Sequence, residues 1–213
     1  MASLSTVGRL LLLVLVGSSL YACEVKVNTS SESATKPAET AKESPSSKPA
    51  SPPQDALDSP EAYYNRSLDS LKTKDFKGAI PDLSEAIRLK PDFAEAYFNR
   101  GKANLGLKDY TAAIADFNEF IRLRPDNASA YYSRGGAKMS SNDKPGAIGD
   151  FTQAVVIDPE YADAYVGRGV TKVDLGDRQG AKADLQKAAD LYKKQGNTKD
   201  LNDVMEAIKG LGL

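Results

Sequence analysis

A repeat of 34 residues constrains the fold of this 213-residue chain more than any other feature of its sequence. When residues 60–195 are aligned with themselves at this spacing, six columns hold a single residue type in all four copies. These columns are Ala62, Ala96, Ala130 and Ala164; Tyr63, Tyr97, Tyr131 and Tyr165; Arg66, Arg100, Arg134 and Arg168; Asp75, Asp109, Asp143 and Asp177; Ala79, Ala113, Ala147 and Ala181; and Asp82, Asp116, Asp150 and Asp184. A period of this length predicts stacked units that bury their apolar faces against one another.

The repeat resembles the tetratricopeptide repeat (TPR) family at its signature positions. If the copies begin at Pro60, Ala94, Ala128 and Ala162, position four is always tyrosine, position eight is small and position twenty is alanine. Proline near the end of three copies (Pro91, Pro125 and Pro159) stops a helix, because its ring cannot continue one. The resemblance covers 136 of the 213 residues. It implies that each copy is a pair of helices and that stacked pairs form a concave groove lined by the first helices.

We therefore expect an all-α fold, an α-solenoid of four TPR helix hairpins with a C-terminal capping helix. The expected repeats span residues 60–93, 94–127, 128–161 and 162–195, and the cap spans 196–213. Lys193 stands where the fourth copy would carry its proline, so its second helix should continue through Leu191 and Tyr192. The cap has apolar residues at helical spacing, namely Leu201, Val204, Met205 and Ile208.

The first 22 residues have the layout of a secretory signal. One charged residue, Arg9, precedes an apolar run from Leu10 to Val16, which is too short to span a bilayer. Leu20-Tyr21-Ala22-Cys23 resembles the lipobox of bacterial lipoproteins, which implies cleavage before Cys23 and lipid (a palmitate-type acyl anchor) on its sulfur. Tyr21 departs from the small or β-branched residue that is usual there, and simple secretion is the alternative.

Residues 23–59 separate this signal from the repeats. From Glu24 to Ser59 there is no aromatic residue, and Ser, Thr, Pro, Lys and Glu dominate. Such a composition buries too little apolar surface to offset the entropy of ordering, so we expect a disordered tether. It would let the folded repeats reach away from a lipid anchor at Cys23.

The repeated charges predict a structural ladder. Arginine and aspartate recur sixteen residues apart in each copy, one in each predicted helix. We expect these pairs to form ion pairs within or between repeats rather than a ligand-binding surface. The pairs are Arg66 with Asp82, Arg100 with Asp116, Arg134 with Asp150, and Arg168 with Asp184.

The family resemblance also predicts which residues face the groove. Positions five, six and nine of the first helices supply the candidates Tyr64, Asn65, Phe98, Asn99, Lys102, Tyr132 and Ser133. Aromatic rings offer contact area at low entropic cost, and asparagine can hold a peptide backbone as both donor and acceptor. The alternative is that the aromatic residues pack between neighbouring first helices. Of the five residues in the carboxylate clamp of TPR co-chaperones, only Asn99 has a match, so binding of chaperone C-termini is not expected.

Composition argues against catalysis. The chain has no histidine and one cysteine, which excludes histidine-dependent triads, imidazole metal sites and intramolecular disulfides. With 28 basic and 29 acidic residues it shows no nucleic-acid footprint, and no cofactor motif is present. We expect a non-catalytic scaffold, exported and lipid-anchored to a cell-envelope membrane, periplasm-facing or at the cell surface, that binds proteins or peptides. The alternatives are a self-associating assembly factor and a secreted, unanchored binding protein.

Overall fold

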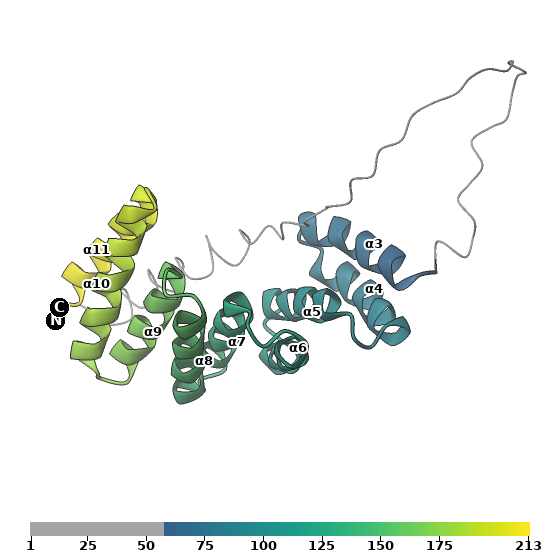
Figure 1. Cartoon of the computed structure of the whole chain (residues 1–213), viewed down its shortest axis with the longest axis horizontal. Helices are drawn as coiled ribbons and strands as arrows, with labels where there is room; N and C mark the ends of the chain where they lie inside the picture. The colour runs from purple at the N-terminus through teal and green to yellow at the C-terminus, as the bar shows by residue number, and fades with distance from the viewer. Residues whose placement is uncertain (1–57) are drawn as a thin grey trace, which may run out of the picture.

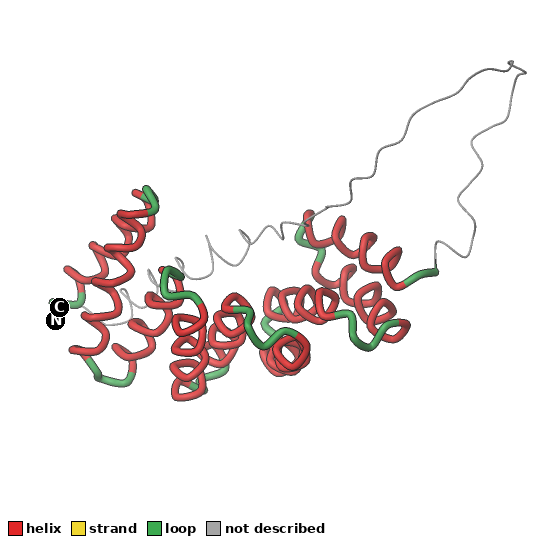
Figure 2. The backbone as a smooth tube through the Cα atoms, in the orientation of Figure 1, coloured by secondary structure: helices red, strands yellow, loops and turns green. Residues whose placement is uncertain are grey.

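The computed structural model describes residues 58–213, and the predicted signal, Cys23 and nearly all of the predicted tether lie outside them. The described part is all-α, with nine helices joined by short turns (Figure 2). In chain order they are α3 (Pro60–Lys72), α4 (Phe76–Leu89), α5 (Ala94–Gly106), α6 (Tyr110–Leu123), α7 (Ala128–Ser140), α8 (Lys144–Ile157), α9 (Ala162–Asp174), α10 (Arg178–Lys194) and α11 (Thr198–Gly210). The predicted fold class is therefore confirmed.

The repeated aspartates Asp75, Asp109, Asp143 and Asp177 begin the second helix of each pair. In each case the carboxylate accepts a hydrogen bond from the backbone N–H three residues later, at 2.8 to 3.0 Å. This satisfies a donor that the first turn of a helix leaves unpaired. The residue before each aspartate has a positive φ, and only the fourth copy places glycine there, Gly176 at φ 83°.

Helices of one pair pack closely because position eight is small. A Cβ atom on Gly101 would come within 2.8 Å of the Phe117 ring, and one on Gly135 within 2.9 Å of the Phe151 ring. Both rings are fully buried, as is the alanine at position twenty in all four copies. The core of each pair thus consists of one large side chain set against small ones, and a larger residue at position eight would separate the helices.

The pairs stack in sequence. Each second helix contacts the first helix of the next pair, and among the first helices α5 contacts α7, and α7 contacts α9. The result is an elongated, curved array in which α3 and α4 lie at one end and α10 and α11 at the other (Figure 1).

The C-terminal helices close the array largely as predicted. Helix α10 continues to Lys194, and Leu191 and Tyr192 are buried. Helix α11 packs on α10 and buries Val204, while Arg178 donates a hydrogen bond to the Leu211 carbonyl at 2.5 Å. Met205 differs from the prediction, because it is 47% exposed. The apolar face of α11 is narrower than its sequence indicates, and Met205 lies at its margin.

Candidate peptide-binding face and the arginine ladder

The predicted groove residues lie on one side of the first helices. We call the surface at positions five, six and nine of α3, α5, α7 and α9 the first-helix face. Positions five and nine are one helical turn apart, so their side chains lie on the same side of each helix. The accessibility of this face falls along the array, from half-buried or exposed side chains at α3 to buried residues at α9.

At α3 and α5 the face is accessible and polar. Asn65 is exposed, and Tyr64 and Asn99 are half-buried. The Asn99 amide donates a hydrogen bond to the Tyr64 hydroxyl at 2.9 Å, which links the two helices. Burial and the charge of Glu95 raise the pKa of Tyr64, while the bond from Asn99 lowers it in part. The phenol is therefore neutral at physiological pH.

Phe98 and Lys102 form the next part of the face. The Phe98 ring is half-buried, with its centroid 4.9 Å from that of Phe120 and 5.7 Å from that of Phe117. The Lys102 Nζ lies 5.8 Å from the Phe98 ring centroid, within the range of a cation–π contact. This region combines an apolar surface with one positive charge.

Tyr132 and Ser133 were predicted to line the groove, and the structure corrects this. They are 4% and 3% exposed. The Tyr132 ring packs between Tyr161, at 5.1 Å, and Phe151, at 5.8 Å, and burial is the main reason that its pKa lies well above the usual value. The aromatic residue of this repeat therefore packs on the second helix of its own repeat and on the residue just before α9.

All four predicted arginine–aspartate pairs are present. Each guanidinium contacts its carboxylate through two nitrogens, with Nη2–oxygen distances of 2.5 to 2.7 Å. Exposure of the arginine side chain falls from 62% at Arg66 to 16% at Arg168. For both of these arginines the hydrogen bond to aspartate is the main reason that the pKa is raised. The ladder is thus a surface feature in the first repeat and mostly buried in the others.

The same arginines also join neighbouring repeats, which the sequence interpretation missed. The third nitrogen, Nη1, donates to a polar residue on the second helix of the preceding repeat. The bonds run from Arg100 to Ser84 at 3.1 Å, from Arg134 to Asn118 at 2.7 Å and from Arg168 to Thr152 at 3.3 Å. The signal for them was in the sequence, because these three acceptors are themselves 34 residues apart.

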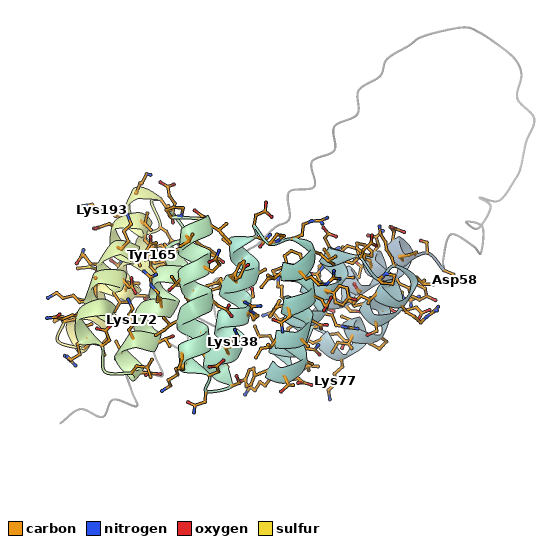
Figure 3. The ribbon with its side chains drawn as sticks, turned by 60° about the horizontal axis from the view of Figure 1, so that its bottom comes forward. Asp58, Lys77, Lys138, Tyr165, Lys172 and Lys193 are labelled. Atoms are coloured by element: carbon orange, nitrogen blue, oxygen red, sulfur yellow. The ribbon has the colours of Figure 1, made fainter. Side chains whose placement is uncertain are left out.

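Additional groups complete the ladder. Each arginine lies over the ring of its repeat's first tyrosine, with centroid distances of 5.0 to 5.7 Å. Lys138 contacts Asp150 at 2.9 Å and Lys172 contacts Asp184 at 2.8 Å, and both lysines are labelled in Figure 3. In the second repeat, Asn104 takes this place and donates to Asp116 at 3.0 Å. The aspartates are therefore fully paired and serve a structural role.

Sequence profiles of the tetratricopeptide repeat family match residues 64–128, 109–164 and 162–195. The chain belongs to the tetratricopeptide repeat family. Together these matches cover the described array from Tyr64 to Gln195. No match was found among curated protein sequences.

Solved TPR structures resemble the array. MamA from Desulfovibrio magneticus RS-1 aligns with a TM-score of 0.62 and 24% identity, over 64% of this chain and 77% of that one. The Arabidopsis OM64 TPR domain aligns with a TM-score of 0.52 and 28% identity, over 54% and 95%. The first TPR of Spaghetti (RPAP3), solved bound to the HSP90 peptide SRMEEVD, aligns with a TM-score of 0.54 and 20% identity, over 55% and 93%.

Two findings bear on other kinds of site in this TPR protein. Across residues 58–213, no cluster of His, Cys, Asp and Glu side chains is arranged to hold a metal ion. Within the same range, no helix has both the length and the apolar character that crossing a bilayer requires.

Proposed function

We propose that this TPR protein is a non-catalytic adaptor that binds segments of partner proteins on its first-helix face. We further propose that a lipid on Cys23 holds it at a bacterial cell-envelope membrane, with residues 24–59 as the tether. The observation that carries the binding proposal is the accessible aromatic and amide surface of α3 and α5 around Tyr64, Asn65 and Phe98. One solved TPR domain of similar fold binds a peptide, which supports the same use here.

The first-helix face suits an extended peptide. Asn65 and Asn99 hold the same position in consecutive repeats, and the Asn99 carbonyl oxygen can accept a hydrogen bond while its amide is engaged by Tyr64. Aromatic side chains beside them supply contact area that is already ordered. Binding would therefore concentrate on repeats 1 and 2, because Tyr132 and Ser133 are buried.

A site-specific photocrosslinker tests the binding proposal. It is placed at Asn65, and in a matched control at Gln153, which is exposed on a second helix. We expect partner proteins crosslinked in cells from position 65 and absent from position 153. Identical products from both positions would move the binding surface away from the first-helix face. Products that contain only this chain would favour the self-association alternative.

Mass spectrometry of the mature protein tests the anchor. We expect an N-terminus at Cys23 that carries a diacylglyceryl group, and loss of membrane association in Cys23→Ser. Two or more acyl chains anchor firmly, whereas one binds reversibly, since each buried CH₂ contributes about 0.8 kcal/mol. An unmodified Cys23, or cleavage at another bond, would contradict the anchor and leave the secreted alternative.

A further inference from the structure

The outer surface of the second helices reverses its charge order along the array. Two positions of the repeat, three residues apart, show the reversal. The first holds Glu85, Glu119, Gln153 and Lys187, and the second holds Arg88, Arg122, Val156 and Asp190. Residues three apart lie on the same side of a helix. Helices α4 and α6 therefore present an acid before a base, α10 presents a base before an acid, and α8 presents neither.

Helix α8 is the centre of this reversal. Its exposed residues are all uncharged, and we call them the α8 outer face: Pro145, Gly149, Gln153 and Val156. Val156 is 65% exposed, more than any other large hydrophobic residue in the range 58–213. The repeat does not require an apolar residue there, because the other three copies have arginine or aspartate. A single exposed valine is ordinary on a protein surface, so it is the charge order on either side of Val156 that points to a partner.

Helix α8 lies between α6 and α10 in the array (Figure 1). Arg134 bonds to both α6 and α8, and Arg168 bonds to both α8 and α10, each through the same two repeat positions. Equivalent residues of the three helices therefore lie at the same level across the array. A second copy related by a two-fold axis parallel to α8 would place its α6 opposite α10 of the first copy, and its α10 opposite α6.

The charges match in that arrangement. Glu119 of one copy faces Lys187 of the other, and Arg122 faces Asp190, on both sides of the axis. Within one chain Glu119 and Arg122 contact each other at 2.9 Å and are 44% and 62% exposed. The contact between copies therefore forms a network of four alternating charges on each side, and networks contribute more than isolated surface pairs.

The reversal also indicates the relative direction of the two α8 helices. If they ran antiparallel, α6 would face α6 and α10 would face α10, and each helix could match its own acid with the base of its copy. Either charge order on α10 would then serve equally well. Only the parallel contact requires α10 to carry the reverse order of α6.

We propose that the α8 outer face is a homodimer contact, in which two copies pack through Gln153 and Val156 with their α8 helices parallel. This inference goes beyond the proposed adaptor function and does not depend on it. Because only second helices form the contact, the first-helix faces of both copies stay free. The dimer would thus offer partner proteins two binding faces in one assembly.

Sedimentation velocity of the full chain with Cys23→Ser tests the contact, since this variant removes the thiol and the proposed lipid. We expect a dimer whose population rises with protein concentration. Lys187→Glu with Asp190→Arg keeps the net charge but sets like charges against each other, so it should weaken the dimer at least about tenfold. Adding Glu119→Lys and Arg122→Asp restores opposite charges and should restore the dimer.

A disulfide tests the position of the axis. The Cys23→Ser chain has no cysteine, and Val156→Cys in it should give a covalent dimer on mild oxidation, because a disulfide forms only where two Cβ atoms come close. Arg88→Cys is the matched control, since it occupies the same repeat position on α4, where the side chain is 66% exposed. It should stay monomeric under the same oxidation.

Three results would overturn the inference. The chain could remain monomeric at every concentration, position 88 could crosslink as readily as position 156, or the dimer could survive the charge reversal in variants that circular dichroism shows to be folded. The photocrosslinker at Gln153 should capture a second copy while that at Asn65 captures partner proteins, so failure of the dimer and failure of the adaptor function are distinguishable.

Discussion

Consecutive repeats pack on one another in two different ways. We call the contact between two consecutive repeats a joint and name it by the numbers of those repeats. At joints 1–2 and 3–4, the aromatic ring at position five stacks on an aromatic residue that directly precedes the next first helix. Tyr64 stacks on Phe93 with centroids 4.8 Å apart, and Tyr132 on Tyr161 with centroids 5.1 Å apart. The ring that packs on the position-five residue at these two joints therefore comes from the residue just before the next first helix.

At joint 2–3 the ring comes from the second helix instead. Phe98 stacks at 4.9 Å on Phe120, which lies on the second helix of its own repeat, and Asn127 takes the place before the next first helix. Joints 1–2 and 3–4 have alanine at the position equivalent to Phe120, namely Ala86 and Ala154. At each joint, either the Phe120 position or the position just before the next first helix supplies the ring that stacks on the position-five residue. The two positions thus compensate for one another, and the interior stays close-packed.

The choice affects helix capping. Asn127 accepts a hydrogen bond from the Ala130 N–H at 2.9 Å and caps α7, whereas Phe93 and Tyr161 give α5 and α9 no side-chain cap. At joint 2–3 the residue before the first helix caps that helix, and the ring comes from Phe120. At the other two joints the residue before the first helix supplies the ring and gives no cap.

Among tests of this comparison, Phe120→Ala should give the largest loss of stability. It removes the ring that stacks on Phe98 at 4.9 Å, and the resulting cavity should cost about 3–5 kcal/mol of unfolding free energy in urea denaturation. Asn127→Phe should restore part of that loss by supplying a ring from the other side. A double-mutant cycle measures the coupling, and strictly additive effects would show that the two positions do not compensate.

The ladder at the same joint gives the next largest effect. Asp150→Ala leaves Arg134 and Lys138 partly buried without their carboxylate, which should cost about 3 kcal/mol. Asp82→Ala is the matched control, because its partner Arg66 is 62% exposed, and it should cost less than about 1 kcal/mol. Equal losses in thermal unfolding would contradict a ladder whose strength depends on burial.

Much of this architecture could be predicted from the 34-residue period. Six columns of residues that are identical in all four copies predicted the helix pairs and the four ion pairs, because a structural role repeats with the fold. The cross-repeat bonds to Ser84, Asn118 and Thr152 went unnoticed, since that column varies in residue type while it keeps a polar group. Variation that preserves chemistry is harder to recognise than identity.

The candidate site was less predictable for a physical reason. Tyr64 and Tyr132 occupy the same position with the same residue, yet only Tyr132 is buried. Burial depends on what the neighbouring helices place over the ring, and position within a single repeat carries no such information. The sequence shows that an aromatic residue stands either at the position of Phe120 or at the position shared by Phe93 and Tyr161. Only the ring contacts in the structure show that both positions pack on the position-five residue.

Alkaline pH should distinguish joint 3–4 from joint 2–3. Burial is the main cause that raises the pKa of both Tyr132 and Tyr192, while joint 2–3 has a phenylalanine with no phenol. A raised folded-state pKa contributes stability that is complete below pH 10 and is lost as the pH rises above the unfolded value. Ionisation of each tyrosine should therefore lower the free energy of unfolding by up to about 1.4 kcal/mol for each pH unit above pH 10.

Substitution by phenylalanine measures this loss. In Tyr132→Phe and Tyr192→Phe, urea unfolding between pH 9 and pH 11 should show a shallower loss of stability than in the parent chain. Stability that falls equally fast in the parent and in both variants would place the alkaline sensitivity elsewhere in the array.

The smallest effect concerns the cap at joint 2–3. Asn127→Ala leaves the Ala130 N–H without its side-chain acceptor and should cost about 1 kcal/mol. Tyr161→Asn at joint 3–4 makes the opposite exchange, because it gains a possible cap for α9 and loses the ring that covers Tyr132. Its net loss should exceed that of Asn127→Ala, since a buried aromatic contact outweighs a cap. If Tyr161→Asn proved neutral in thermal unfolding, capping rather than stacking would decide which residue precedes each first helix.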